Sequence, residues 1–203
     1  MSPELPRSWV LASSNPGKLR EMRALLAPIG LSLVSQSERG VIQPPETAPT
    51  FVENALAKAR QACAQSGLPA IADDSGLAVA ALQGRPGIHS ARYGGDNASD
   101  AENVEKLLAA LVDVPDSQRE ASFHCVVVAM THPDDPAPLV AYGTWRGRIA
   151  RKPRGHAGFG YDPVFVGHGS DRTAAQLTAE SKNRISHRGK ALATLVRALA
   201  ARQ

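Results

Sequence analysis

The chain has few cysteines, few aromatic residues and no long apolar run, and each shortage excludes a class of protein. Its 203 residues include two cysteines, Cys63 and Cys125, which are far apart and indicate neither a disulfide framework nor a cysteine-based metal site. Aromatic residues make up 4% of the sequence, too few for the stacking rings of a single-strand nucleic-acid-binding surface. No stretch approaches the ~18 apolar residues of a membrane span.

The composition is that of an ordinary globular protein. Hydrophobic residues make up 43% and charged residues 21%, and this length suits one domain, so we expect residues 1–203 to form a single domain. Pro3, Glu4 and Pro6 stand where a signal peptide would need an apolar run, which predicts a cytoplasmic location. The net charge of +4 suits a polyanionic partner, either nucleic acid or a phosphorylated small molecule, and charge alone does not choose between them.

Strand and helix signals alternate along the chain and predict an α/β fold. Residues 9–13 are typical of a buried strand, and apolar residues at helical spacing over 19–29 predict a helix that ends at Gly30. A capping box at Thr50-x-x-Glu53 predicts a second helix ending near Gly67. Further strands are predicted at 31–34, 70–72, 77–82, 123–130 and 139–149, and further helices after Ser99-x-x-Glu102, after Thr173-x-x-Gln176 and around Leu192, Leu195, Val196 and Leu199.

Two adjacent carboxylates, Asp73 and Asp74, follow the short apolar run at 70–72, where we expect the strand to break into a turn. Neighbouring side chains of a strand point to opposite faces, so one carboxylate can face a cleft while the other faces its own loop. Carboxylate oxygens suit Mg²⁺, which shares its shell with substrate phosphates. The alternative is an Asx turn, in which either carboxylate bonds the backbone of Ser75 and Gly76.

The segment 13–18 lies between the first strand and the first helix, where ligands of α/β folds gather. Hydroxyl, amide and ammonium donors there favour a phosphate, although the sequence is neither a Walker A loop nor a dinucleotide fingerprint. Alternatively, Asn15 caps the helix with Pro16 at its first position. The residues concerned are Ser13, Ser14, Asn15, Pro16, Gly17 and Lys18.

Two later motifs also combine donors with close backbone approach. The basic side chains of the segment 186–190 lie at the start of the last predicted helix, where the positive end of the helix dipole repels them, and a bound anion would relieve this repulsion. Alternatively, the basic side chains are simply hydrated at the surface. The segment 158–163 places aromatic rings and a carboxylate between glycines, which suits either a flat ligand or a turn whose rings plug the core. The candidate residues are Phe159, Gly160, Tyr161, Asp162, Lys182, His187 and Arg188.

Five ordered blocks resemble the inosine triphosphate pyrophosphatase family, which removes noncanonical purine nucleoside triphosphates. The blocks are LASSNPGK, TFVENALAKA, IADDSGLAVAALQGRPGIHSARY, GFGYDPVF and SKNRISHRGKAL. The resemblance implies a central mixed β-sheet flanked by helices, two lobes with the active-site cleft between them, and a homodimer. It also implies Mg²⁺-dependent hydrolysis of dITP, ITP or XTP to the nucleoside monophosphate and pyrophosphate, without a nucleic-acid or membrane partner.

The resemblance also implies roles for single residues. Asp74 would accept a proton and meet Mg²⁺ together with Glu46, and Ser75 would touch the substrate. The segment 13–18 would hold the polyphosphate, and 159–162 would frame the base. Lys182, His187 and Arg188 would close the site, and Asp73 would support the loop.

The chain departs from the family pattern in two places. The family commonly has Thr-Gly-Asn where this chain has Ser13-Ser14-Asn15, and often a Glu-Glu pair plus Gly where it has only Glu46 within 45–48. Two other readings compete: a pyrophosphatase of modified pyrimidine triphosphates, which LASS at 11–14 also fits, and a basic nucleic-acid-binding module without catalysis. Salt-dependent DNA binding without nucleotide turnover would favour the second.

Overall fold

A computed structural model describes residues 8–202. Pro3, Glu4 and Pro6, on which the expected location depends, lie outside these residues. Within the described part, no helix is long and apolar enough to cross a membrane.

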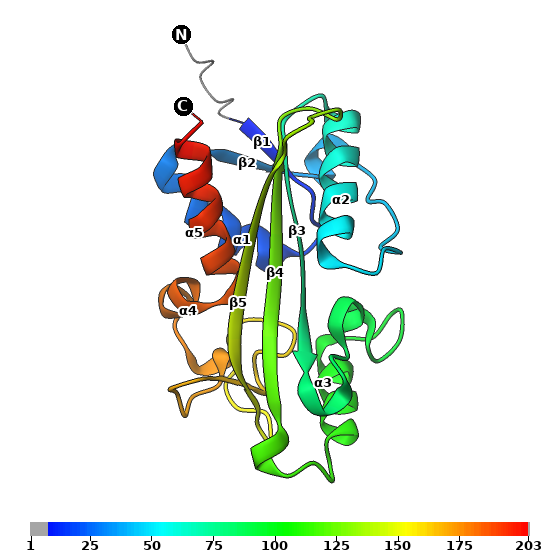
Figure 1. Cartoon of the computed structure of the whole chain (residues 1–203), viewed down its shortest axis with the longest axis vertical. Helices are drawn as coiled ribbons and strands as arrows, with labels where there is room; N and C mark the ends of the chain where they lie inside the picture. The colour runs from blue at the N-terminus through cyan, green and yellow to red at the C-terminus, as the bar shows by residue number, and fades with distance from the viewer. Residues whose placement is uncertain (1–7, 203) are drawn as a thin grey trace. The chain divides into compact units, whose positions relative to one another are not determined.

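The strands form one mixed sheet, as predicted, in the order β2-β1-β3-β4-β5-β6 (Figure 1). Strand β1 pairs in parallel with β2 and β3, whereas β5 and β6 are antiparallel. The strands are β1 (Ser8–Leu11), β2 (Ser32–Ser35), β3 (Ala70–Val79), β4 (Glu120–Met130), β5 (Leu139–Ile149) and β6 (Phe165–Gly167).

The predicted helices begin at side-chain caps. Thr50 caps the start of α2, and Gly67, which adopts the left-handed conformation, ends this helix. Ser99 and Glu102 form the complete capping box of α3. Asn15 caps α1, whose first residue is Pro16. The α-helices are α1 (Pro16–Leu26), α2 (Phe51–Ser66), α3 (Asp100–Ala110), α4 (Ala179–Ile185) and α5 (His187–Ala200), so that the flanked α/β architecture is confirmed.

The chain divides into two compact units, each built from discontinuous segments. Unit 1 comprises residues 1–74, 125–143 and 188–203, of which 8–202 are described, and unit 2 comprises 75–124 and 144–187. Strands β3, β4 and β5 each contribute residues to both units. The units are therefore joined covalently at four points, three of them inside strands.

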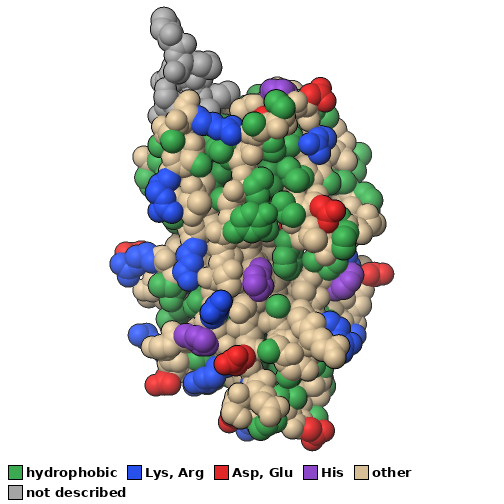
Figure 2. Space-filling model, in the orientation of Figure 1, with side chains coloured by type: hydrophobic (Ala, Val, Ile, Leu, Met, Phe, Trp, Pro, Cys, Tyr) green, Lys and Arg blue, Asp and Glu red, His purple; other side chains and the backbone are tan. Residues whose placement is uncertain are grey.

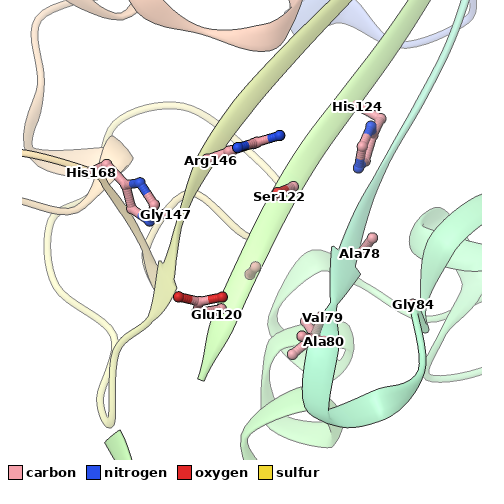
Figure 3. A pocket seen from close by; sticks show the side chains of 11 residues that line it. Ala78, Val79, Ala80, Gly84, Glu120, Ser122, His124, Arg146, Gly147 and His168 are labelled. Atoms are coloured by element: carbon pink, nitrogen blue, oxygen red, sulfur yellow. The ribbon is translucent and has the colours of Figure 1, made fainter. Parts of the chain in front are cut away.

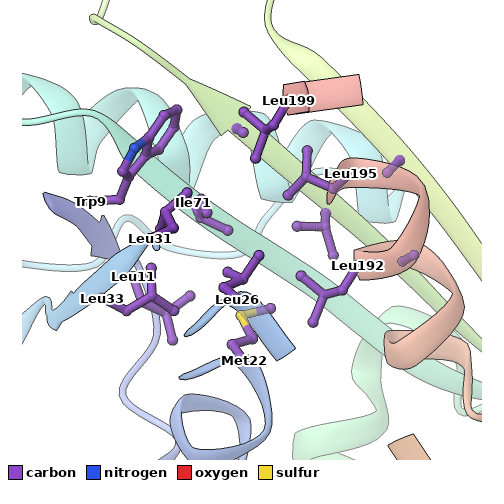
Figure 4. Packing of buried hydrophobic residues seen from close by; sticks show 14 of the residues in the cluster. Trp9, Leu11, Met22, Leu26, Leu31, Leu33, Ile71, Leu192, Leu195 and Leu199 are labelled. Atoms are coloured by element: carbon purple, nitrogen blue, oxygen red, sulfur yellow. The ribbon is translucent and has the colours of Figure 1, made fainter. Parts of the chain in front are cut away.

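In unit 1 the alternation of β1 sends apolar side chains to both faces of the sheet. Trp9 and Leu11 join Met22 and Leu26 of α1 and Leu192 of α5 in one buried cluster (Figure 4). On the other face, the neighbouring β1 residues pack against the alanines and Cys63 of α2. A strand with both faces covered is apolar throughout, which explains the continuous run at 9–12.

Unit 2 has its own core, with aromatic rings at its centre. The Phe165 ring lies 4.6 Å from that of Phe123 and 4.9 Å from that of Trp145. Arg119 is also buried, and its guanidinium donates to the carbonyl oxygens of Ile149 (2.9 Å) and Ala150 (3.3 Å). This arginine fixes the end of β5, from which the chain continues into the segment 150–163.

The expected turn at Asp73-Asp74 was wrong, because β3 runs without a break from Ala70 to Val79. Charged residues are depleted in strands, so the pair suggested an end. Basic side chains contact both carboxylates here, which lets the strand continue. The predictions also missed α4 and β6, whose seven and three residues are too short for a periodic signal.

Candidate active site

Strand β3 directs Asp73 and Asp74 to different partners, both within unit 1. The Asp73 carboxylate lies 3.0 Å from the Lys18 ammonium and 3.4 Å from the Arg188 guanidinium. Arg188 also pairs with Glu21 of α1. The Asx-turn alternative is therefore wrong, and Asp73 contacts the first and last helices rather than supporting its own loop.

The environment of Asp73 keeps its carboxylate ionised. Burial raises the pKa of this group, but the positive charges of Lys18, Arg188 and Lys58 outweigh burial and lower the pKa below its ordinary value. Asp73 therefore stays negative at any pH at which the protein is expected to work, which is not the behaviour of a proton acceptor.

Helix α2 positions Asp74 through two residues one turn apart. The Lys58 ammonium lies 3.0 Å from Asp74 Oδ1, and Asn54 Nδ2 donates to Asp74 Oδ2 at 3.2 Å. Residues i and i+4 of a helix project from the same face, so the capped helix fixes both contacts together. The apolar residues of α2 predicted this face only as a packing surface.

The same two side chains hold the loop that carries Glu46. Lys58 contacts Glu46 Oε1 at 2.8 Å, and the Asn54 side chain exchanges hydrogen bonds with the Ala48 backbone N–H (3.1 Å) and C=O (3.3 Å). Glu46 and Asp74 therefore contact a single ammonium, although they are distant in the sequence. The family resemblance implied that these carboxylates share a site, and α2 brings both into contact with Lys58.

The residues at this site fit a magnesium ion. Burial raises the pKa of Asp74, Lys58 lowers it in part, and the negative charge of Glu46 raises it again, so a further cation would relieve repulsion that one ammonium leaves. Mg²⁺ commonly uses one or two carboxylates and completes its shell with water and substrate phosphates. Among residues 8–202, no group of three or more His, Cys, Asp and Glu side chains could hold a metal ion. At this site the protein would supply two carboxylates, Asp74 and Glu46.

The donors of the segment 13–18 are engaged within the protein. Asn15 Oδ1 accepts from the backbone N–H groups of Gly17 (2.8 Å) and Lys18 (3.1 Å), as the capping alternative predicted. Ser13 Oγ accepts from the Asn15 N–H at 3.2 Å, and Ser14 Oγ accepts from Gln36 at 2.6 Å. The loop is thus held in one conformation, and the cap occupies the backbone N–H groups of Gly17 and Lys18.

In unit 2, Asp162 organises the segment 158–163. Its Oδ2 accepts from the Lys182 ammonium at 2.6 Å and from the Phe159 backbone N–H at 3.0 Å. The Lys182 ammonium also lies 4.9 Å from the centre of the Phe159 ring. The predicted proximity of Lys182 to 159–162 is therefore seen, with Asp162 as the link.

Neighbouring elements fix the two ends of this segment. The Gly160 N–H donates to Asp100 of α3 at 2.7 Å, and the Thr173 hydroxyl donates to the Arg154 carbonyl at 2.6 Å. The Ala175 N–H donates to the Asp162 carbonyl at 3.1 Å. Asp100 was not predicted, because a carboxylate in the first turn of a helix is explained by the helix dipole alone.

Tyr161 and His187 pack into unit 2 rather than presenting free donors. The Tyr161 ring is in the core, and its hydroxyl donates to the Ser90 carbonyl at 2.8 Å, as the core-plug alternative predicted. The His187 ring stacks on Phe123 at 4.6 Å between centroids. Ser75 lies half-buried in β3 of the same unit.

Lys58 and Asn54 are the residues that sequence reasoning did not select. Both lie in the block TFVENALAKA, directly beside the alanines of the packing face. The available signal in the sequence was their spacing, since residues four apart lie on the same face of a helix. The structure shows that both side chains are buried. A buried lysine needs a negative partner, which points to the two carboxylates.

Unit 2 also has a hollow that none of the predicted site residues lines. It encloses about 380 Å³ and is formed by the open faces of β3, β4 and β5 (Figure 3). His124, Arg146 and His168 contribute polar groups to it, together with Glu120 and Ser122. Burial lowers the pKa of His124, and the positive charge of Arg146 lowers it further.

The fold and these side chains define a class of protein: an α/β protein with two carboxylates suited to a divalent cation, next to basic side chains suited to phosphate. The chain belongs to the Ham1 family, whose model matches residues 9–198. A dITP/XTP pyrophosphatase of Yersinia pseudotuberculosis is 59% identical over 190 residues, covering 94% of this chain and 96% of that protein. A dITP/XTP pyrophosphatase of Escherichia coli O157:H7 is 56% identical with the same coverage.

Solved structures support the same assignment. A HAM1 protein from Coxiella burnetii has a TM-score of 0.88 and 52% identity, over 98% of this chain and 100% of that one. A nucleoside-triphosphatase described as a dITP/XTP pyrophosphatase, from Mycobacterium abscessus, has a TM-score of 0.74 and 47% identity, over 93% and 98%. The predicted family and fold class are confirmed.

Proposed function

We propose that this protein hydrolyses noncanonical purine nucleoside triphosphates, dITP, ITP or XTP, to the nucleoside monophosphate and pyrophosphate. Family membership and the names of the 55–59% identical relatives support the reaction class. The observation that carries the chemistry is the convergence of Asp74 and Glu46 on one ammonium, 3.0 and 2.8 Å away. This arrangement supports a cation-binding role for the two carboxylates.

Asp74 and Glu46 would hold Mg²⁺, which when bound polarises the phosphate and neutralises its charge. Lys18 adds a positive charge at the start of α1, where a helix N-terminus favours an anion. Its ammonium is already oriented by Asp73 at 3.0 Å. The segment 13–18 would bind the polyphosphate in a conformation that Asn15 and Gln36 fix in advance, which lowers the entropy cost of binding.

Asp74 is the proton acceptor in this proposal. Its raised pKa makes it a stronger base than Asp73, whose pKa is lowered. An ionised carboxylate can accept about four hydrogen bonds. Lys58 and Asn54 each donate one to a different oxygen of Asp74, so Asp74 can still accept a hydrogen bond from a water molecule. The proton would pass from that water to Asp74 as the water oxygen bonds to the α-phosphorus, and the bond from this phosphorus to the α,β-bridging oxygen would break, releasing pyrophosphate.

The purine would be framed by Phe159, Gly160, Tyr161 and Asp162, with Lys182, His187 and Ser75 contacting the nucleotide. The Phe159 ring is held by its neighbouring ammonium and its backbone bond to Asp162. Arg188 faces two carboxylates, Asp73 and Glu21, so we assign it to orienting Asp73 rather than to reading a base edge.

The proposal is tested by incubating the protein and Mg²⁺ with dITP, XTP, ITP, dATP and dGTP, and measuring pyrophosphate and orthophosphate separately. We expect pyrophosphate from the first three and slow turnover of the last two. Predominant orthophosphate would show cleavage of the γ-phosphate and contradict the proposed reaction. A preference for modified pyrimidine triphosphates would replace the proposed substrate class.

Replacing the proposed base tests its role directly. Asp74→Asn keeps the shape of the side chain and one acceptor oxygen, which Lys58 can still contact, although the amide nitrogen cannot accept from Asn54; we therefore expect the fold to persist at some cost in stability while kcat falls about 10³-fold. Circular dichroism checks the fold, and initial rates of pyrophosphate release check activity. Wild-type kcat in this variant would remove Asp74 from the reaction.

We further propose a homodimer that acts in the cytoplasm on a free nucleotide, with no nucleic-acid partner. The low aromatic content, 4% of the sequence, supports the last point, since single-strand binding surfaces use stacking rings. The face that Figure 2 shows carries acidic as well as basic side chains. Light scattering after gel filtration tests the dimer, and retention on heparin or DNA at physiological salt would contradict the absence of a nucleic-acid partner.

A further inference from the structure

Lys58 occupies the position between the two carboxylates that the proposed metal would also need. Its ammonium lies 2.8 Å from Glu46 and 3.0 Å from Asp74, and its side chain is 2% exposed. A buried lysine with two carboxylate partners is satisfied as an ion pair, so nothing else is needed to explain its burial. The question is what this ammonium does when a divalent cation arrives.

The scaffold around Lys58 is fixed rather than adaptable. Helix α2 is capped at Thr50, and the Ala59 and Ala62 side chains beside Lys58 are fully buried in the core of unit 1. Asn54, one turn earlier, holds Asp74 and the Glu46 loop independently of Lys58. The carboxylates therefore have a second anchor, and the ammonium can change partners without releasing them.

We propose that Lys58 is a resident counter-cation, which neutralises Asp74 and Glu46 in the metal-free protein and competes with the divalent cation for their oxygens. This inference rests on the proposed function, because it takes Asp74 and Glu46 as the metal-binding carboxylates. Lys58 acts on these ligands and is a positioning residue. Without it, two carboxylates would repel each other in a largely buried place.

The proposal predicts opposite effects of Lys58→Met on metal binding and on stability. Methionine fills a similar volume without charge, so the divalent cation no longer meets a competing ammonium, and we expect Mg²⁺ to bind about tenfold more tightly. In metal-free buffer the variant leaves the carboxylate pair without its ammonium, and its Tm should fall. Saturating Mg²⁺ should restore most of that loss, since a ligand of the folded state stabilises it.

The experiment titrates Mg²⁺ alone, without nucleotide, into the full chain by calorimetry, and records Tm with and without Mg²⁺. Wild type, Lys58→Met and Asp74→Asn are compared. Lys152→Met is the matched control, because Lys152 is exposed and is not among the residues that contact Asp74 or Glu46 or that surround Asp162. The control should have the wild-type affinity and Tm. If Lys58→Met does not fold without Mg²⁺, Lys58→Gln, which can still donate to both carboxylates, is measured instead.

The outcomes separate this inference from the proposed function. Tighter Mg²⁺ binding in the Lys58 variant, lost in Asp74→Asn, supports both. Equal or weaker binding in the Lys58 variant, with normal binding by wild type, overturns the counter-cation role and leaves the metal site standing. Wild-type binding that survives Asp74→Asn unchanged, or no binding by any of these proteins, overturns the proposed metal site and this inference with it.

Discussion

At the scale of single residues, two neighbouring aspartates acquire different properties from their surroundings. Asp73 faces two basic side chains and has a lowered pKa, whereas Asp74 shares one ammonium with Glu46 and has a raised pKa. Both carboxylates are buried, so the difference between their pKa values comes from their charged partners and not from their exposure. Asp73 therefore organises charge, whereas the raised pKa of Asp74 supports its proposed role as the proton acceptor.

Asp73→Asn should destabilise the fold and change its response to acid. The buried Arg188 would lose one of its two carboxylates, which we expect to cost about 3 kcal/mol in unfolding free energy. The lowered pKa means that Asp73 stabilises the wild type fully above pH ~4 and less as the pH falls below it. Urea unfolding between pH 7 and 3 measures both effects, and the variant should show the shallower decline.

Asp171→Asn is the control for that measurement. Asp171 is fully exposed, and its contact with Arg148 is 3.8 Å long, so the loss should stay within about 0.5 kcal/mol. A loss for Asp73→Asn no greater than for this control would show that the buried ion pairs contribute nothing to stability.

At the scale of elements, the segment 158–163 depends on a glycine next to a carboxylate. Gly158 has a φ of +79°, and a Cβ placed there would lie 1.9 Å from Asp162 Oδ2. The absence of a side chain therefore lets Asp162 fold back to accept the Phe159 N–H while it holds Lys182. A backbone detail thus determines where an aromatic ring and an ammonium lie.

Gly158→Ala should displace Asp162 and impair nucleotide binding. We expect KM to rise at least about tenfold, which corresponds to about 1.4 kcal/mol of lost binding, while the Mg²⁺ affinity of unit 1 is unchanged. Steady-state kinetics and Mg²⁺ titration measure the two effects. Gly169→Ala is the control, because Gly169 has a φ of +75° and no atom within 4 Å of a new Cβ. Equal KM changes in both variants would attribute the effect to backbone strain alone.

Elements with strong local signals could be predicted from the sequence. Capping residues and apolar periodicity predict helices α2 and α3. The observed helices begin at Phe51 and Asp100, directly after the predicted capping residues Thr50 and Ser99. Strand β3 could not be predicted in full, because its continuation through two charges depends on Lys18 and Lys58, which are distant in sequence. Local propensity has no access to such contacts.

At the scale of the whole molecule, the chain passes between its units four times, and β3, β4 and β5 continue from one into the other. Neither unit is a continuous piece of sequence. Neither can therefore fold from one uninterrupted fragment, and unfolding one unit disturbs three strands of the other. We expect a single cooperative transition, because three strands continue from one unit into the other.

The two tryptophans test this expectation, because Trp9 lies in unit 1 and Trp145 in unit 2. Both are buried, at 1% and 5% exposure, so their fluorescence should change on unfolding. In Trp9→Phe and in Trp145→Phe, the remaining tryptophan reports one unit, and its urea transition should coincide with that of far-UV circular dichroism. Separate midpoints would show that the units unfold independently.

Much of the candidate site could be predicted as a set of residues, but not as a set of contacts. The motifs identified Asp74, Lys18 and Lys182, because unusual charges near predicted turns and glycines stand out in a sequence, whereas Glu46 was implied only by the family resemblance. Lys58 was not predicted as a site residue, because a lysine in an amphipathic helix usually lies on the solvent-exposed face. Only the tertiary fold shows that this lysine is buried between two carboxylates.

The pairing of Arg188 with Asp73 has a consequence for biosynthesis. Arg188 follows Asp73 by 115 residues, whereas Lys18 precedes Asp73 in the chain. A nascent chain that already carries β3 can therefore pair this carboxylate with Lys18, but it lacks the buried guanidinium until α5 has been translated. A chain terminated before residue 188 would leave Asp73 and Glu21 without the arginine that contacts both, which would weaken the folded state of unit 1 and expose the product to quality-control proteases.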